Sequence, residues 1–401
     1  MPGEGIGQIL TVNTGSSSLK VALYGSDLQR VLSAKVERIG SEQGHVHVTS
    51  ADGSTLLNEQ QAVPNHGAAL DAILRWLHGN DASLHLAGVG HRVVYGGAQF
   101  REPQVVSDEM LEALRLLEPI DPDHLPQALN AVVATRRAFP QVPQVACFDT
   151  TFHKDMPEVA RTYALPRDVR QDGVIRYGFH GLSCEYVMQE LFRLDPEAAN
   201  GRVIIAHLGN GASMTAVRHG AGIDTTMGFT PTGGLVMGTR SGDLDPGVLL
   251  YLLRSRGLSV DALTTMVNAQ SGLLGISGST SDMRDLLERA PNNGDAELAV
   301  AVFCYTAQKF LGSLAAALGG LDVLVFTGGI GEQAPQIRER ICSDLAFLSV
   351  RVDPQRNATN AAVISPDGAR VTVRVCATDE DLMIARHTKR LLKEGTDHVQ
   401  I

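Results

Sequence analysis

The sequence lacks the features of a fibrous, secreted or nucleic-acid-binding protein. Aromatic residues make up 5% of its 401 residues, with one tryptophan, and none of its five cysteines forms a C-x-x-C pair. Scattered cysteines in an odd number favour reduced thiols in a cytoplasmic protein over a disulfide framework. The net charge of −10 disfavours a binder of nucleic acid or of anionic membranes.

Membrane and common nucleotide-binding signals are also missing. The first residues, MPGEGIGQ, lack the basic and apolar regions of a secretion signal. The longest apolar stretch, Phe310 to Leu321, is too short to span a bilayer and predicts a buried helix. There is no Walker A loop, and Gly3, Gly5 and Gly7 precede the first strand instead of following one. P-loop and NAD chemistry are therefore disfavoured.

What the sequence does contain is a repeated pattern. Ile9 to Tyr24 reads ILTVNTGSSSLKVALY, and Val203 to Arg218 reads VIIAHLGNGASMTAVR. Each segment predicts a β-hairpin with small residues at its tip. Backbone N–H groups at such a tip can face outward and favour phosphate oxygens. The repetition predicts two related domains that face one nucleotide.

Helical and strand-like patterns alternate through the rest of the chain, which predicts an α/β protein large enough for two domains. We expect the domain boundary just after Asp149, and we expect the last helix to return to the first domain and close a hinge. The expected helices are 68–78, 107–118, 247–256, 295–318 and 380–392, and the expected strands are 86–94, 144–148 and 322–326.

A third glycine-rich element follows the last of these strands, in VLVFTGGIGEQ at 323–333. A buried strand that ends in glycines before a helix is typical of ligand sites in α/β proteins, and a nucleotide is the expected ligand. A plain glycine turn is the alternative for any one such element.

Two arginines and a histidine lie beside glycines. Arg92 is in GHRVVYGG and Arg240 in MGTRSGDLDPG, where a guanidinium fork could bind an anion through two oxygens. An ordinary salt bridge is the alternative for each arginine. His180 lies in YGFHGLS, where a structural hydrogen bond is the alternative to a role in catalysis.

Taken together, the motifs VNTGSSSLK, GHRVVYGG, CFDTTFH, RYGFHG, HLGNGAS, MGFTPTGGLVMGTRSGDLDP, FTGGIGE and TDEDLMIAR resemble those of acetate kinases, in the same order from residue 12 to residue 386. The resemblance implies the α/β fold of the actin-like ATPases, with two duplicated ribonuclease-H-like domains, a central cleft and a homodimer. The implied domains are residues 1–150, joined by the C-terminal helix 384–401, and the nucleotide-binding residues 151–383.

The resemblance also implies a reaction, the reversible in-line transfer of phosphate from ATP to acetate, giving acetyl phosphate and ADP with Mg²⁺, or Mn²⁺ as the alternative. A carboxylate is already ionised at neutral pH, so catalysis needs charge neutralisation and alignment more than a strong base. No nucleic-acid or membrane partner is implied.

The residues that match the family's site are as follows. The implied catalytic residues are Asp149, His180 and Arg240; the substrate-binding residues are Arg92, Val94, Phe179 and Pro231; and the metal-associated pair is Asn13 and Glu380. The implied nucleotide contacts are Lys20, His207, Leu208, Gly209, Asn210, Gly211, Asp282, Met283, Arg284, Gly329, Ile330, Gly331, Glu332 and Gln333.

One motif departs from the family. Where members commonly read APLHNP, this chain reads EPIDPDHLP at 118–126, so a second active-site histidine falls either on Asp121 or on His124. A negative aspartate cannot donate to a phosphate.

Two other functions stay open. A propionate or butyrate kinase would differ in the volume of the acyl pocket beside Val94. An actin-like ATPase that binds a protein partner would hydrolyse ATP without acetate and expose a large apolar patch.

Overall fold

The computed structural model describes residues 7–15, 18–80 and 84–397 of the chain, which forms two compact units. Unit 1 comprises residues 1–151 and 379–401, and unit 2 comprises residues 152–378. The breaks expected from the sequence were after residues 150 and 383. Several positions used in the sequence argument lie outside the described residues: Gly3, Gly5, the hairpin-tip residues Ser16 and Ser17, and residues 398–401 of the last expected helix.

Unit 1 contains an eight-stranded mixed sheet in the order β5-β4-β3-β2-β1-β6-β8-β7. Its strands are β1 (Gln8–Thr14), β2 (Ser18–Tyr24), β3 (Arg30–Glu37), β4 (Ser41–Ser50), β5 (Thr55–Val63), β6 (Leu86–Val93), β7 (Gln104–Val105) and β8 (Gln144–Phe148). Its helices are α1 (His66–Asn80), α2 (Asp108–Arg115), α3 (Leu125–Ala138) and α16 (Glu380–Asp397).

The predicted first hairpin is confirmed, because β1 and β2 pair antiparallel with Ile9 opposite Tyr24. On its other side β1 pairs parallel with β6, and β6 pairs parallel with β8. These central strands are apolar because helices cover the sheet: α1 and α3 pack with the core formed by residues such as Leu10, Leu70 and Val89.

The last helix belongs to unit 1, as the sequence predicted. It packs against β6 and β1, and the close approach depends on two glycines of β6. A side chain at Gly88 would meet Leu392 at 2.8 Å, and one at Gly90 would meet Ile384 at 2.5 Å. Glycine is therefore needed at both positions for α16 to lie on the strand. The separate expectation of a hinge stays a prediction.

Unit 2 contains a five-stranded sheet in the order β11-β10-β9-β12-β13. Its strands are β9 (Arg202–Leu208), β10 (Ala212–Arg218), β11 (Ala221–Thr225), β12 (Val323–Thr327) and β13 (Thr372–Val375). Its α-helices are α4 (Glu158–Arg161), α5 (Arg167–Gln171), α6 (Gly181–Leu194), α7 (Pro196–Ala199), α8 (Pro246–Arg254), α9 (Val260–Ala269), α10 (Gly272–Ser277), α11 (Met283–Arg289), α12 (Gly294–Leu318), α13 (Gly328–Gln333), α14 (Pro335–Cys342) and α15 (Pro354–Ala358). Short 3₁₀ turns occur at Thr151–His153, Ala290–Asn292 and Ala346–Leu348.

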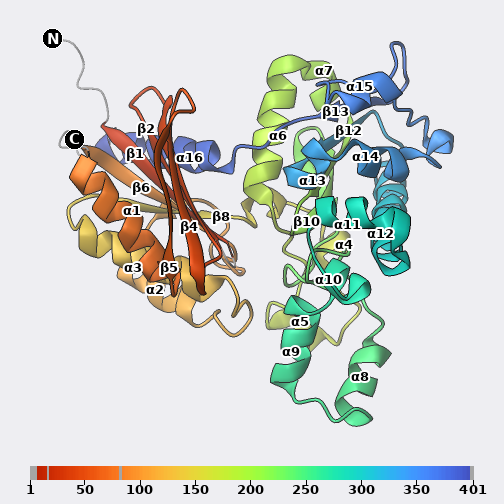
Figure 1. The fold of residues 1–401 in the computed structure, drawn as a ribbon, viewed down its shortest axis with the longest axis horizontal. Helices are drawn as coiled ribbons and strands as arrows, with labels where there is room; N and C mark the ends of the chain where they lie inside the picture. The colour runs from red at the N-terminus through yellow and green to blue at the C-terminus, as the bar shows by residue number, and fades with distance from the viewer. Residues whose placement is uncertain (1–6, 16–17, 81–83, 398–401) are drawn as a thin grey trace. The chain divides into compact units, whose positions relative to one another are not determined.

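The two sheets share one pattern of strand directions, and Figure 1 labels several of the strands concerned, among them β1, β2 and β6 in unit 1 and β10, β12 and β13 in unit 2. In unit 1, β3-β2-β1-β6-β8 has two antiparallel pairs followed by two parallel pairs. In unit 2, β11-β10-β9-β12-β13 has the same sequence of pairings. The predicted second hairpin, β9 and β10, occupies the place of β1 and β2. The repeated hairpins thus begin two sheets of the same local topology.

The long apolar helix α12 is a core helix of unit 2. Within the described residues it is the one helix that is long and apolar enough to cross a membrane by length and composition. Ten of its side chains are buried, and it packs against α10, α11, α14 and the strand β10. It ends at Gly319, whose φ of +70° provides the left-handed turn that commonly terminates a helix.

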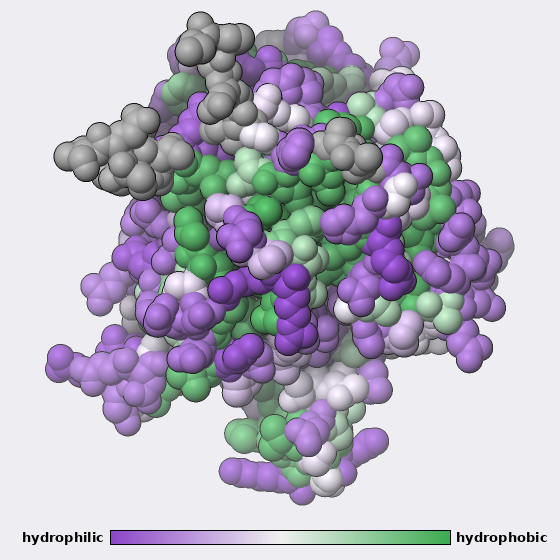
Figure 2. All heavy atoms as spheres, turned by 90° about the vertical axis from the view of Figure 1, so that its left-hand side faces the viewer, coloured by the Kyte–Doolittle hydropathy of each residue, from purple (hydrophilic) through white to green (hydrophobic). Residues whose placement is uncertain are grey.

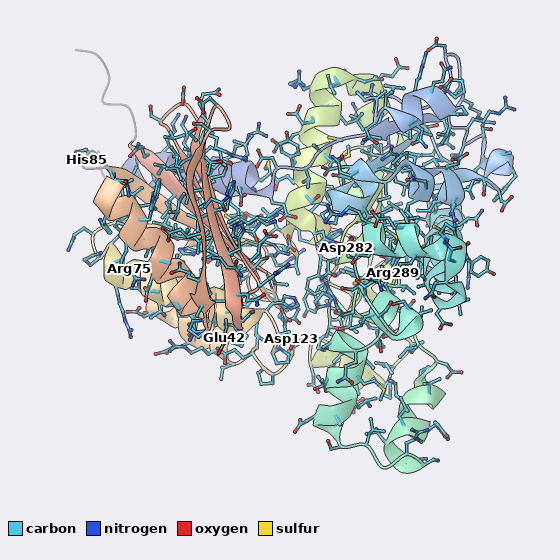
Figure 3. The ribbon with its side chains drawn as sticks, in the orientation of Figure 1. Glu42, Arg75, His85, Asp123, Asp282 and Arg289 are labelled. Carbon is cyan, nitrogen blue, oxygen red and sulfur yellow. The ribbon has the colours of Figure 1, made fainter. Side chains whose placement is uncertain are left out.

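Polar and apolar side chains are interspersed on the face of the molecule that Figure 2 shows. Charged residues also mark helix ends. Asp282 and Arg289 lie at opposite ends of α11 (Figure 3), where Asp282 accepts a hydrogen bond from the backbone N–H of Arg284. Their charges complement the helix dipole and stabilise the helix.

Candidate functional site

In unit 1, four of the predicted site residues lie together at the carboxyl ends of neighbouring strands. Asn13 is near the end of β1, Arg92 is in β6, and Asp149 immediately follows β8. Glu380 is the first residue of α16. Because β1, β6 and β8 run parallel, their carboxyl ends meet at one edge of the sheet, which is where α/β folds commonly place ligands.

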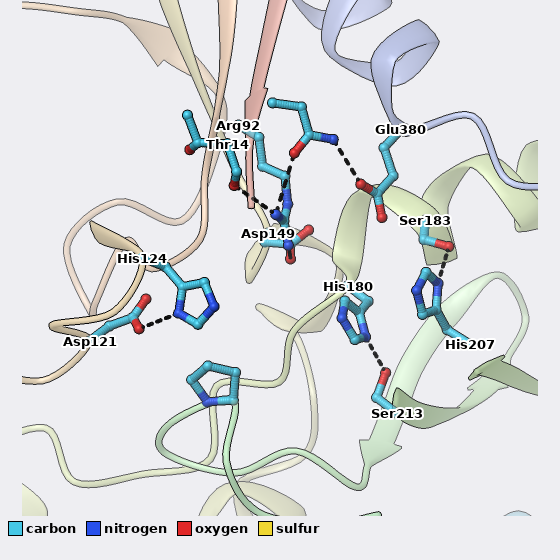
Figure 4. Close-up of polar contacts among 12 residues, drawn as sticks. Thr14, Arg92, Asp121, His124, Asp149, His180, Ser183, His207, Ser213 and Glu380 are labelled. Carbon is cyan, nitrogen blue, oxygen red and sulfur yellow. Dashed lines mark hydrogen bonds and ion pairs between the residues drawn. The ribbon is translucent and has the colours of Figure 1, made fainter. Parts of the chain in front are cut away.

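Arg92 is the centre of this cluster (Figure 4). Its Nη2 donates to Asp149 Oδ2 at 2.7 Å, and its Nη1 donates to Asn13 Oδ1 at 3.4 Å and to the Thr14 carbonyl at 3.5 Å. The Arg92 side chain is 12% exposed and that of Asp149 is fully buried. Burial alone would lower the pKa of Arg92, but nearby carboxylates, Asp149 first, raise the pKa overall. The guanidinium therefore stays charged, and its hydrogen bonds fix its orientation.

The Asn13 and Glu380 side chains are also in direct contact, since Asn13 Nδ2 donates to Glu380 Oε2 at 3.0 Å. Together they offer amide and carboxylate oxygens, which suit Mg²⁺ or Mn²⁺. Among the described residues there is no group of three His, Cys, Asp or Glu side chains that could hold a metal. Two oxygen-bearing side chains suit an ion that keeps several waters and takes the rest of its ligands from phosphates, as Mg²⁺ commonly does.

In unit 2, Arg240 and His180 meet at the tip of the second hairpin. A Cβ atom built on Gly211 would lie 2.6 Å from Arg240 Nη2 and 3.3 Å from His180 Nε2. Both donors therefore face one small volume that glycine leaves open. Arg240 Nη1 donates to the Pro231 carbonyl at 2.7 Å, which holds the side chain in place.

His180 has an unusual backbone conformation. Its φ of +58° is left-handed, which is uncommon for a residue other than glycine and often marks a functional position. The glycine pattern around it has a steric cause, because a Cβ on Gly178, whose φ is +74°, would lie 2.7 Å from the ring of His153. The backbone thus turns sharply at the start of α6 and presents the His180 imidazole.

Two serines hold the histidine rings of unit 2. His180 Nδ1 lies 2.9 Å from Ser213 Oγ, and His207 Nδ1 lies 2.8 Å from Ser183 Oγ (Figure 4). The two rings stack, with centroids 4.2 Å apart. Because the Ser213 contact occupies Nδ1 of His180, Nε2 is the atom that faces Gly211 and Arg240.

The predicted glycine-rich turn after β12 is present, while nucleotide binding by this turn stays a prediction. The residues of the turn differ in their structural roles. Glu332 Oε1 accepts from the backbone N–H of Gly328 at 2.9 Å and of Thr378 at 3.2 Å, so this carboxylate supports the turn itself. Gly329 lies beside the hairpin tip, since a Cβ on Gly209 would be 4.0 Å from the Gly329 nitrogen. The two glycine-rich elements of unit 2 therefore adjoin.

A buried arginine supports the same turn. Arg338 is fully buried, and it donates to the carbonyls of Gly331 at 2.8 Å and Glu332 at 3.0 Å. It also donates to Asn357 Oδ1 at 2.8 Å and to Asn360 Oδ1 at 2.6 Å. Sequence reasoning missed Arg338, because nothing in QIRER distinguishes it from a surface arginine.

The remaining predicted residues are divided between the units. Lys20, in β2, lies opposite Asn13, and Val94 follows β6 and is 2% exposed, both in unit 1. Phe179, which is 1% exposed, and Pro231, which is buried, belong to unit 2. The other predicted contacts, also in unit 2, are Leu208 at the end of β9, Asn210 at the tip, Met283 and Arg284 at the start of α11, and Ile330, Gly331 and Gln333 in α13. The residues predicted to line the acyl pocket thus come from both units, Val94 from unit 1 and Phe179 and Pro231 from unit 2.

Sequence reasoning also missed Ser183 and Ser213. Ser183 belongs to the motif YGFHGLS and Ser213 to HLGNGAS. The sequence signal that could have identified them is their spacing from a histidine in the same motif. Ser213 lies opposite His207 in the β9–β10 ladder, and Ser183 is the third residue of α6, within its first turn. Strand register and helix geometry therefore bring these hydroxyls to the rings.

Comparison with known proteins gives consistent matches. A family model described as the acetokinase family matches residues 8–386. A curated acetate kinase of Rhodopseudomonas palustris is 45% identical over 395 residues, which is 96% of this chain and 99% of that protein. The crystal structure of Porphyromonas gingivalis acetate kinase is 38% identical, with a TM-score of 0.84, and the match covers 96% of this chain and all of that one. A propionate kinase structure from Francisella tularensis is 36% identical, with a TM-score of 0.90 and the same coverage.

Proposed function

The chain belongs to the acetokinase family, and on that premise we propose that it catalyses reversible phosphoryl transfer between ATP and acetate, giving acetyl phosphate and ADP. Its fold class is the α/β actin-like ATPase fold that the motifs predicted. The observation that carries the proposal is the convergence of Arg240 and His180 on the space at Gly211. Paired donors of this kind stabilise charge on the equatorial oxygens of a phosphoryl group in flight.

Unit 1 contributes the acyl substrate's binding groups in this proposal. Arg92 binds the acetate carboxylate through the guanidinium edge that Asp149 does not occupy. Asp149 orients Arg92, since its carboxylate is buried and 2.7 Å from Nη2. A role in orientation suits the chemistry, because the acetate nucleophile carries no proton for a base to remove.

Charge balance supports the magnesium part of the proposal. Arg92 interacts electrostatically with three carboxylates, Asp149, Glu380 and Asp121. Anionic substrates would be repelled by this excess of negative charge unless a cation were bound near it. We propose that Asn13 and Glu380 hold Mg²⁺, or Mn²⁺ in its place, through waters and oxygen ligands. Such an ion would neutralise charge on the nucleotide phosphates.

In unit 2 we propose that the two glycine-rich elements and the start of α11 bind the nucleotide. The hairpin tip from His207 to Gly211 and the turn from Gly329 to Gln333 supply backbone N–H groups for its phosphates. Asp282 and Arg284 contact its ribose or base from the first turn of α11. Arg338 supports the nucleotide turn through its bonds to Gly331 and Glu332.

The acyl specificity follows from Val94. We expect the chain to use acetate best, propionate less well and butyrate poorly, in a hydroxamate assay of ATP-dependent acyl phosphate formation. One methylene is worth about 1–3 kcal/mol in such a pocket, so Val94→Ala should raise the propionate-to-acetate ratio of kcat/KM roughly 10-fold.

Val89→Ala is the matched control for this prediction. Val89 is in β6, the strand that Val94 follows, and is fully buried in the unit 1 core. Val89→Ala should lower the free energy of unfolding by an amount comparable to that of Val94→Ala. It should leave the propionate-to-acetate ratio of kcat/KM unchanged. A Val94→Ala ratio equal to that of the wild type would refute the pocket assignment. A wild-type preference for propionate would favour the propionate kinase alternative.

We also propose that the chain forms a homodimer through α8 and α9. Neither helix has a buried residue, although Val248, Leu250, Tyr251 and Val260 are 42%, 48%, 55% and 70% exposed. An apolar helix face is normally buried against another protein surface, and a second copy of the chain is the proposed partner. Sedimentation equilibrium should give a dimer for the wild type and a monomer for Leu250→Glu/Tyr251→Glu.

The control for the dimer is Val159→Glu in α4, an apolar residue that is 87% exposed outside these helices. It should remain dimeric. A monomeric wild type would contradict the homodimer but would leave the kinase assignment unaffected.

We propose a cytoplasmic location as well, because the five cysteines form no disulfide and four of them are buried. Cell fractionation tests this location.

A further inference from the structure

A groove in unit 2 is lined by none of the residues assigned to the proposed kinase site. It is bounded by the short helices α4 and α5, which Figure 1 labels, and it has a volume of about 530 Å³. Its lining residues lie between Met156 and Ile175 in the sequence. The volume is within the usual range of small-molecule sites, about 300–1,000 Å³. The groove is therefore large enough to hold a ligand of its own.

Three arginines line this groove, Arg161 in α4 and Arg167 and Arg170 in α5. The one carboxylate in the lining is that of Glu158, so the groove carries an excess of positive charge in a chain whose net charge is −10. Among the described residues no carboxylate forms an ion pair with any of the three guanidinium groups. Three cationic forks without a carboxylate beside one groove indicate an anionic ligand.

Few N–H groups of these arginines have an acceptor in the protein. Arg161 Nη1 donates to the Lys154 carbonyl at 3.3 Å, and Arg170 Nε donates to the Leu165 carbonyl at 3.2 Å. Arg161 Nε is buried and has no hydrogen-bond partner within the described part of the chain. A buried donor without an acceptor is costly. A ligand oxygen at the Arg161 fork would lower that cost.

The backbone that carries Arg161 is held by other segments of unit 2. Thr162 and Ile175 form an antiparallel bridge, and the Arg176 backbone N–H donates to the Arg161 carbonyl at 2.8 Å. The Arg176 guanidinium in turn donates through Nη1 to the three carbonyls at 225–227, each at 3.1 Å. Arg161 therefore projects into the groove from a fixed strand-like segment, as a preorganised binding site requires.

A phosphate monoester suits these donors better than a carboxylate does. It has three terminal oxygens and a charge of about −1.5 to −2 at neutral pH, which three guanidinium forks can share. A carboxylate offers two oxygens and a single charge. The rest of the lining is mixed, because Met156 and Ile175 are apolar, whereas Glu158, Thr162 and Gln171 can pair with hydroxyl groups. Such a lining suits a ligand body that carries several hydroxyl groups, as a sugar does.

We propose that this groove is a second ligand site, in which Arg161, Arg167 and Arg170 bind the phosphate group of a phosphorylated sugar. The hydroxyl groups of the sugar pair with Glu158 and Gln171. The site lies within unit 2 and shares no residue with the proposed acetate and nucleotide sites. Binding in the groove therefore requires neither substrate of the proposed kinase.

Isothermal titration calorimetry of the full chain with glucose 6-phosphate tests the site. We expect saturable binding with a Kd below about 1 mM, weaker binding of inorganic phosphate, and no binding of glucose, which lacks the charge. Glucuronate, which has a carboxylate in place of the phosphorylated carbon, should bind at least ~10-fold more weakly than glucose 6-phosphate. Equal affinities for these two anions would overturn the phosphate assignment. Binding of inorganic phosphate alone would overturn the sugar assignment, and no binding of any of them would overturn the site.

Glutamine variants test the three arginines one at a time. Arg161→Gln and Arg170→Gln should each weaken the binding of glucose 6-phosphate at least ~10-fold, the scale of one lost hydrogen bond to a charged group. Arg167 is exposed, so Arg167→Gln should weaken binding without a change in urea unfolding. Arg351→Gln is the matched control, because Arg351 is an exposed arginine of unit 2 outside the groove. Wild-type affinity in all three groove variants would overturn the proposal.

Arg240→Ala distinguishes the groove from the proposed kinase site. This variant removes a donor proposed for the transferred phosphoryl group and should bind glucose 6-phosphate as tightly as the wild type does. Loss of binding in Arg240→Ala would place the sugar phosphate at the kinase site and overturn this inference. A wild-type chain that forms no acyl phosphate would overturn the proposed function, but the calorimetric result for the groove would stand.

Discussion

Replacing Arg240 by alanine is expected to lower kcat for acetyl phosphate formation at least ~100-fold, the scale on which enzymes lose a single transition-state donor. The reason is local, because Arg240 Nη2 and His180 Nε2 face the same space beside Gly211. The affinity for ATP, measured by calorimetry, should stay within about 3-fold of the wild type. Arg240→Lys should restore little of the rate, since an ammonium lacks the planar fork.

A second variant tests the same geometry without removing a charge. In Gly211→Ala the new methyl group would lie 2.6 Å from Arg240 Nη2, so the guanidinium must move. We expect kcat to fall with no comparable loss of stability. Gly312→Ala in α12 is the matched control, because, apart from the backbone of its own helix and its chain neighbours, no atom of the described residues lies within 4 Å of its added Cβ. Wild-type kcat in both Arg240→Ala and Gly211→Ala would remove the basis for assigning these donors.

Replacing Arg92 by alanine is expected to affect both substrate binding and folding. Loss of a charge-assisted clamp should lower kcat/KM for acetate about 10- to 100-fold, mainly through KM. The free energy of unfolding should fall by about 3–5 kcal/mol, because the fully buried Asp149 would lose its cationic partner. Arg92→Lys should keep more of the stability than of the acetate affinity, since it retains the charge and loses the fork.

Arg136→Ala in unit 1 is the control for the stability part. Arg136 pairs with Asp108 at 2.6 Å, but the two side chains are 36% and 77% exposed. Such a surface pair contributes about 0–1 kcal/mol, so urea unfolding should hardly change. An Arg92→Ala protein as stable as the wild type would show that Asp149 is not held by this arginine. An unchanged KM for acetate would remove Arg92 from the substrate site.

The sequence was sufficient for the parts of the fold that carry local signals. Both hairpins were predicted because their apolar runs flank small residues, and the turn after β12 because a buried strand ends in glycines. The strands β3 and β5 were missed. Every residue of β5 except Val63 is at least partly exposed, so the strand has no alternating pattern of apolar residues by which to recognise it.

The candidate site was predictable only where a motif surrounds the functional residue. His180 stood out because its left-handed backbone and the tight packing at Gly178 require the neighbouring glycines. Ser213 and Arg338 did not stand out, because their roles depend on contacts with residues distant in sequence. The pairing of Asp121 with His124 is intermediate. The two residues are three positions apart in the sequence, but their hydrogen bond depends on how the loop enters α3.

The most direct test of the central claim is the ratio of ADP to acetyl phosphate that the purified wild-type protein forms from ATP with Mg²⁺. Arginine and histidine donors that act on transfer to a carboxylate predict one ADP for each acetyl phosphate, and almost no ADP when acetate is omitted. ADP release at the same rate with and without acetate would contradict the account. It would instead favour an ATPase that binds a protein partner.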